Sequence, residues 1–259
     1  MAVLDTIADH QAGWSVTANN LKTRIDRARW AIFGFSVLGA LLAAIASQWT
    51  NPAGTAVSIT SDPRTWIALC GALSLAAATF FTQRLLGKEH IAAWVRARAI
   101  SEALKREAYK YAAGGTPYDQ ADRDAKLDSE RQVIEGDGDD LLADYVRSAG
   151  KGSAPRQMLS HAEYISRRVD GQIAWYRKTA GKNQHTAKFL RRAEFWLALT
   201  ATLITAIAPV TGKHTALYGH VFDIAALTAV LTTVASAVLG ARRSISFRLS
   251  SDSVSFSGQ

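Results

Sequence analysis

Four stretches of the chain contain no charged residue, whereas charged residues crowd the segments between them. The uncharged stretches are residues 30–49, 65–83, 195–212 and 224–241, each 18 to 20 residues long. A helix of that length covers roughly the 30 Å hydrocarbon core of a bilayer. Trp30, Trp49, Trp66 and Trp196 lie at the ends of these stretches, where the indole ring favours the lipid headgroup region. The pattern predicts four transmembrane helices. The alternative, four buried helices of a soluble protein, is disfavoured by the basic flanks.

Basic residues are distributed unevenly around these stretches. Only Arg64 lies between the first and second stretches, and only Lys213 lies between the third and fourth. Because Lys and Arg concentrate on the cytoplasmic side of a membrane, both termini and the central segment are expected in the cytoplasm. Ala44-Ile45-Ala46 is similar to a signal-peptidase site, but the long arm ahead of it and the length of the apolar stretch favour a membrane span.

The expected fold is an all-α membrane protein with four transmembrane helices arranged as two hairpins, and with long cytoplasmic helical extensions packed as a stalk. Five regions follow from the pattern. These are a cytoplasmic amphipathic arm (1–29), a first transmembrane hairpin (30–86), a cytoplasmic helical stalk (87–193), a second transmembrane hairpin (194–241) and a short cytoplasmic tail (242–259).

Helical periodicity extends into the cytoplasmic regions. Apolar residues of the arm, from Leu4 to Ile25, recur on one face, and the basic residues that follow suit either an anionic membrane surface or ordinary anchoring. The second span is expected to continue without a break to residue 112, giving a helix of about 48 residues that ends at Gly114-Gly115-Thr116-Pro117. Residues 119–135 are expected to form a surface helix or a mobile connector, and a further helix is expected to begin near Pro155.

Composition adds little evidence of chemistry. The net charge is +8, and the single cysteine, Cys70, excludes an intramolecular disulfide and a cysteine-based zinc site. The six histidines are scattered, and no HExxH or GxSxG motif is present. The acidic run at 137–140 lacks the spacing of a calcium loop and is interpreted as a solvated turn. We therefore expect no enzyme activity, no metal and no cofactor.

The third and fourth apolar stretches carry hydroxyl side chains at helical spacing. In the fourth stretch these residues fall four apart, on one face of a helix. Such a face either packs against neighbouring helices or, in an oligomer, lines a water-filled pore. Asp223 precedes the fourth stretch at its expected outer end, where it either selects cations or caps the helix. The candidate pore-lining residues are Thr200, Thr205, Thr228, Thr232, Ser236 and Asp223.

Two stretches next to the expected hairpins resemble a known family. The first is Trp94-x3-Arg98-x3-Glu102-x-Leu104-Lys105-x-Glu107, and the second is Arg167-Arg168-Val-Asp170-Gly-Gln172-Ile-Ala-Trp175-Tyr176-Arg-Lys178-x-Ala180-x2-Asn183. Both are similar to SLATT proteins, the SMODS- and SLOG-associated two-transmembrane effectors, and the pair resembles a tandem of two units. The short tail differs from the stalk that would follow a complete second unit. The candidate stalk or gating residues are Trp94, Arg98, Glu102, Asp170, Gln172, Trp175, Tyr176 and Asn183.

The resemblance implies a multi-pass effector in the bacterial inner membrane that serves a nucleotide-signalling, antiviral conflict system. The leading hypothesis is an oligomer that permeabilises or depolarises the membrane when it is activated. The alternative is a non-conducting anchor or scaffold that recruits a cytoplasmic partner. Expected partners are the lipid bilayer, further copies of the chain, and a nucleotide or a nucleotide-sensing protein, but not DNA. The basic residues around Trp175 either bind an anionic nucleotide or anchor the stalk beside the membrane.

Overall fold

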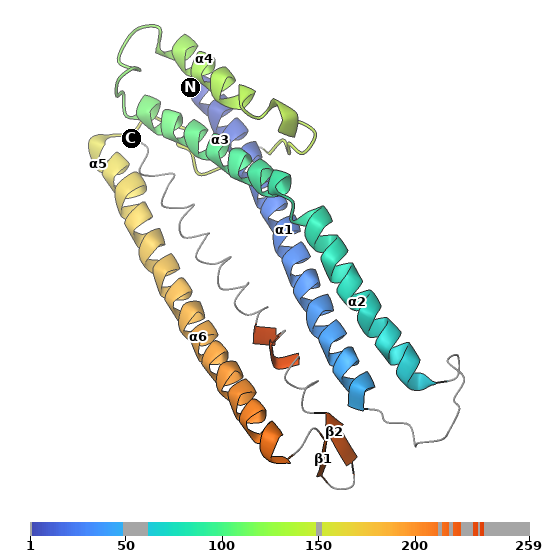
Figure 1. Cartoon of the computed structure of the whole chain (residues 1–259). Helices are drawn as coiled ribbons and strands as arrows, with labels where there is room; N and C mark the ends of the chain where they lie inside the picture. The colour runs from blue at the N-terminus through green and yellow to red at the C-terminus, as the bar shows by residue number, and fades with distance from the viewer. Residues whose placement is uncertain are drawn as a thin grey trace. The chain divides into compact units, whose positions relative to one another are not determined.

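The computed structural model describes residues 2–48, 62–148, 152–211, 214–217, 220–223, 230–232 and 234–235. Its long helices are α1 (Ala2–Gln48), α2 (Pro63–Leu85), α3 (Lys88–Ala112), α4 (Arg123–Gly136) and α6 (Gly171–Thr211). Figure 1 shows α1 and α6 as long continuous helices. The short elements are a 3-10 turn (Asp139–Leu141), α5 (His161–Tyr164), a π-helical segment (Ile165–Asp170), β1 (His214–Leu217) and β2 (His220–Asp223).

The predicted helical fold is confirmed from α1 to α6, and a small antiparallel sheet follows. Strands β1 and β2 pair from His214 opposite Asp223 to Leu217 opposite His220. This sheet occupies the expected connection between the third and fourth apolar stretches. Most of the predicted fourth span lies outside the described residues, so that span and the arrangement as two hairpins stay predictions.

The chain divides into two compact units. The first, which we name the helical body, comprises Met1–Arg27 and Leu85–Thr179. The second, which we name the apolar unit, comprises Ala28–Arg84 and Ala180–Gln259. Helices α1 and α6 therefore each contribute residues to both units.

The core of the helical body is formed where the first half of α1 packs against α3. Leu4, Ile7 and Trp14 of α1 are at most 2% exposed, and Leu104 of α3 is fully buried. The predicted apolar face of the arm is thus confirmed, and protein covers it. Other core residues, from α3 and from the segments after it, are Ala97, Ile100, Ala108, Tyr111, Tyr118, Leu127, Leu141 and Leu159.

The helix that was expected to continue from the second span is interrupted. Helix α2 ends at Leu85 and α3 begins at Lys88, with Gly87 in an extended conformation (φ −54°, ψ 151°) at the N-cap. Glycine disfavours the helix interior because it loses the most backbone freedom there, so a break at this position is physically reasonable. The prediction of an unbroken 48-residue helix is therefore wrong.

The two other expected helix boundaries had different outcomes. The end of α3 is confirmed: Gly114 has φ +65°, and the Gly115 N–H donates to the Lys110 carbonyl at 3.0 Å. The expected start near Pro155 is wrong. The next helix begins at His161, because the Ser160 hydroxyl accepts a hydrogen bond from the Glu163 N–H while the Glu163 carboxylate accepts one from the Ser160 N–H.

In the apolar unit, α1 and α2 approach each other closely through glycines. A Cβ added to Gly39 would lie 3.0 Å from the Gly71 carbonyl oxygen, and one added to Gly71 would lie 3.2 Å from the Gly39 oxygen. Phe35 stacks on Phe81, with ring centroids 5.7 Å apart. Among the described residues, α1 and α2 are the two helices long and apolar enough to cross a membrane.

Many large apolar side chains of α1 and α2 face outward. Trp30 is 74% exposed, Phe80 61% and Leu73 60%. Lipid, unlike water, favours such a surface, since exposed apolar patches of this kind are rare on soluble monomers. The exposed apolar residues on these helices also include Leu38, Leu41, Ile45, Trp66 and Leu69.

Candidate functional site

The helical body contains a set of buried polar side chains that join α1 to distant parts of the chain. Gln11, Thr17, Ser101 and Glu107 are each at most 6% exposed. Because a buried polar group without a partner is costly, the partners of these side chains specify one packing arrangement.

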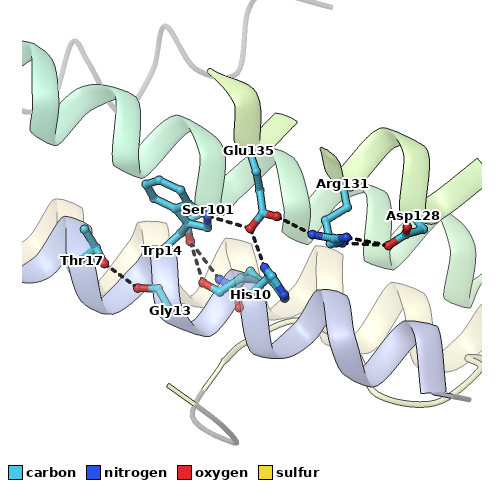
Figure 2. A network of polar contacts seen from close by, with 9 residues as sticks. His10, Gly13, Trp14, Thr17, Ser101, Asp128, Arg131 and Glu135 are labelled. Atoms are coloured by element: carbon cyan, nitrogen blue, oxygen red, sulfur yellow. Dashed lines mark hydrogen bonds and ion pairs between the residues drawn. The ribbon is translucent and has the colours of Figure 1, made fainter. Parts of the chain in front are cut away.

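The Glu135 carboxylate, near the end of α4, is the centre of a polar cluster (Figure 2). One oxygen, Oε1, accepts a hydrogen bond from the Trp14 indole N–H at 2.9 Å and lies 2.7 Å from His10 Nδ1. The other, Oε2, lies 2.6 Å from Arg131 Nη1, and Arg131 also binds Asp128 at 2.8 Å. Burial alone would raise the pKa of Glu135, but the hydrogen bonds from His10 and Trp14 hold that pKa below its ordinary value. The carboxylate therefore clamps α1 to α4 in its ionised form.

A second polar contact holds α1 against α3 and the segment after the 3-10 turn. The Gln11 amide nitrogen donates to the Ser101 hydroxyl at 3.1 Å, and the Gln11 amide oxygen accepts from the Ser153 N–H at 3.1 Å. Six residues further along α1, the Thr17 hydroxyl donates to the Gly13 carbonyl and accepts from the Val146 N–H, both at 2.9 Å. These bonds hold Val146 and Ser153 on the arm.

A third polar cluster lies at the end of α3. The Tyr118 hydroxyl donates to Glu107 Oε2 at 2.9 Å, and Lys110 and Arg106 bind Oε1 at 3.2 and 3.1 Å. Burial opposes ionisation of Glu107, yet the hydrogen bonds from Tyr118, Lys110 and Arg106 keep its pKa below the ordinary value. Burial and the same carboxylate raise the pKa of Tyr118. The cluster ties the turn after α3 to the helix.

The predicted stalk residues fall on α3, the π-helical segment and α6. On α3, Arg98 and Glu102 form the expected ion pair at 2.7 Å, and Trp94 packs against the core with Lys22 over its ring. Trp175 and Tyr176 of α6 are 50% and 40% exposed and contact each other edge to face. Asp170 ends the π-helical segment, and Gln172 and Asn183 lie on α6.

The start of the second family-like stretch contacts α3 two residues beyond the end of the first. The Arg168 guanidinium lies over the Tyr109 ring, 5.2 Å from its centroid, and Tyr164 contacts the same ring edge to face at 6.0 Å. Packing of the two helical extensions along their length as a stalk stays a prediction.

The predicted pore residues are described only in part. Thr200 of α6 is exposed and donates to the Trp196 carbonyl at 2.7 Å, which satisfies its hydroxyl within the helix. Thr205 lies on α6, Thr232 is an exposed helical residue, and Asp223 ends β2. Thr228 and Ser236 lie outside the described residues. A pore lined by these side chains stays a prediction.

Sequence reasoning did not single out most of the residues that hold the helical body together, namely His10, Gln11, Tyr118 and Glu135. No short motif marks them, and the residues that they join lie up to 142 positions apart along the chain. Within the described ranges, no group of three or more His, Cys, Asp or Glu side chains is placed to hold a metal ion.

Taken together, the two apolar helices and the helical body define a helical protein with a membrane-facing part. Residues 164–243 match the family described as SMODS and SLOG-associating 2TM effector domain 1, which confirms the SLATT resemblance for that part of the chain. Residues 12–126 match a second family, described as a protein of unknown function (DUF4231). No curated protein and no solved structure matches the chain. The SLATT match, with two candidate membrane helices, suggests a membrane effector of conflict systems.

Proposed function

We propose that this protein is an inner-membrane effector of a bacterial nucleotide-signalling, antiviral conflict system, and that it oligomerises and permeabilises or depolarises the membrane when activated. The observation that carries the proposal is the match of residues 164–243 to the SLATT effector family. The outward-facing apolar side chains of α1 and α2 support a lipid environment for the apolar unit. In this proposal four helices cross the membrane and both termini are cytoplasmic.

Activation in this proposal begins in the helical body. A bound partner or nucleotide stabilises one arrangement of the body over another, as any ligand-driven change requires. Helix α6 continues from the body into the apolar unit, so a change in the body turns the hydroxyl-bearing face of α6 and of the following span. The exposed hydroxyls of Thr200 and Thr232 are then candidates to contact water in the pore.

A leak assay on proteoliposomes, together with membrane-potential dyes in cells that overproduce the protein, tests the proposal. Thr232→Leu and Ser236→Leu are expected to abolish dye leak and depolarisation, because a bulky apolar side chain blocks hydration of the pore. Thr79→Leu is the matched control: Thr79 is exposed on α2 and its hydroxyl bonds its own helix, so leak is expected to continue. If the unsubstituted protein produces neither leak nor depolarisation, permeabilisation is refuted and a non-conducting scaffold is favoured. Cross-linking in membranes tests oligomerisation separately.

A further inference from the structure

One face of α3 gathers positive charge beside the π-helical segment. Arg98, Glu102, Lys105 and Tyr109 follow each other at spacings of four, three and four, which places them along one side of the helix. Arg168 reaches this face from the π-helical segment and lies over the Tyr109 ring. Two segments that are far apart in the sequence therefore contribute cations to one location.

The carboxylates near this face do not neutralise it. Glu102 is bound to Arg98 at 2.7 Å, and the next carboxylate along α3, Glu107, is bound by Tyr118, Lys110 and Arg106. Among the residues that the structure describes, neither Lys105 nor Arg168 forms an ion pair with a carboxylate.

The charge of Arg168 acts on Lys105. Burial lowers the pKa of Lys105; Glu102 opposes this change, while the charges of Arg168 and Arg98 lower the pKa further. The Nη1 atom of Arg168 is buried and has no hydrogen-bond partner in the described part of the chain. The Tyr109 ring attracts the guanidinium through a cation–π contact, which leaves Nη1 without an acceptor oxygen. In the described part of the chain, both cations therefore lack an anionic group bound directly to them.

We propose that Lys105 and Arg168, with Arg98 at the edge, form a binding site for the phosphate group of an anionic ligand. A phosphate supplies two negative charges and several acceptor oxygens, which match two uncompensated cations better than a single carboxylate does. That this site binds phosphate does not depend on the proposed function. That an activating nucleotide acts at this site does rest on the proposed function. An anion that bridges α3 and the π-helical segment would favour the packed arrangement of the helical body.

Calorimetric titration of the full chain in zwitterionic detergent tests this site, with inorganic pyrophosphate as the first probe. We expect saturable binding and an increase in Kd of about tenfold or more for Lys105→Gln and for Arg168→Gln, since each loses a charge-assisted contact. Lys88→Gln and Lys126→Gln are the matched controls, because both side chains are exposed, on α3 and α4; their Kd is expected to stay within about twofold. The proposal is overturned if the protein binds neither pyrophosphate nor vesicles of anionic phospholipid. It is also overturned if the control substitutions weaken binding as much as Lys105→Gln and Arg168→Gln do.

Two further binding measurements identify the molecule that carries the phosphate. A nucleoside triphosphate that binds while its unphosphorylated nucleoside does not indicates a soluble nucleotide. Binding that appears only with vesicles containing anionic phospholipid, and that Lys105→Gln abolishes, indicates a lipid headgroup. A nucleoside that binds as tightly as its triphosphate overturns the proposal.

If Arg168→Gln fails to fold, as judged by circular dichroism, the charge-keeping variants Arg168→Lys and Lys105→Arg replace it and are expected to retain binding. Loss of binding in both folded variants overturns the proposal. Leak without phosphate binding refutes this binding site and supports the proposed permeabilisation. Phosphate binding without leak supports the site and refutes permeabilisation.

Discussion

Substitution of Glu135 tests whether the buried polar contacts hold the helical body together. Glu135→Gln removes the negative charge while keeping the size of the side chain. The ionised carboxylate is bound by Trp14, His10 and Arg131 at 2.6 to 2.9 Å, and hydrogen bonds to a charged group contribute about 1.5–3 kcal/mol each. The amide retains one acceptor oxygen but directs an N–H toward a former donor. We therefore expect a loss of about 2 kcal/mol in the free energy of unfolding.

Thermal unfolding of the full chain in detergent, followed by tryptophan fluorescence, measures this loss. At pH 7 the Tm is expected to fall by about 4–8 °C, on the relation between free energy and Tm for chains of this size. Trp14 is 1% exposed and reports directly on the site. The matched control is Glu130→Gln on the same helix, which is expected to change stability by less than about 0.5 kcal/mol.

The difference between Glu135→Gln and the unsubstituted protein also depends on pH. The pKa of Glu135 in the folded protein lies below its ordinary value of 4.5, so the folded state favours the ionised form. Its stabilisation is therefore complete above pH 4.5 and is lost as the pH falls through the lowered pKa. The Tm gap should shrink in acid. A gap of the same size at pH 3, or equal effects of Glu135→Gln and Glu130→Gln at pH 7, would refute this account.

Two further predictions concern packing. Gly71→Ala places a Cβ 3.2 Å from the Ala43 backbone nitrogen and should separate α1 from α2, whereas Gly34→Ala meets nothing within 4 Å; the first variant, and not the second, is expected to lower the Tm in detergent. Leu104→Ala removes a fully buried side chain and should cost about 3 kcal/mol in chemical unfolding, while Leu142→Ala, at a side chain that is 59% exposed, should cost less than about 1 kcal/mol. Equal effects within either pair would contradict the packing described.

Local signals in the sequence were sufficient to predict most helices. Uncharged stretches located α1 and α2, helical periodicity identified the buried face that includes Leu4 and Trp14, and glycine chemistry located the end of α3. The same periodicity does not reveal what covers a face. Lipid and protein both accept an apolar surface, so the contact of the arm with α3 could not be distinguished from contact with a membrane.

The remaining features depend on contacts between distant residues or on small local effects. Glu135 is one of several carboxylates in an acidic region, and only its approach to residues more than 120 positions away distinguishes it. The π-helical segment at Ile165–Asp170 holds more residues per turn than an α-helix, so the spacing from Arg168 to Trp175 does not report a shared face. Strands β1 and β2 are four residues long, too short for an alternating pattern to stand out.

The interruption between α2 and α3 has a mechanical consequence. The helical body and the apolar unit are joined by three connections, two of which, α1 and α6, are unbroken helices. An intact helix is stiff against bending, because curvature stretches its backbone hydrogen bonds. Gly87, next to the third connection, lies at the break between α2 and α3, where the helical hydrogen bonds are interrupted. The break at Gly87 leaves this stretch of the backbone less stiff than α1 and α6, whose hydrogen bonds continue without a break.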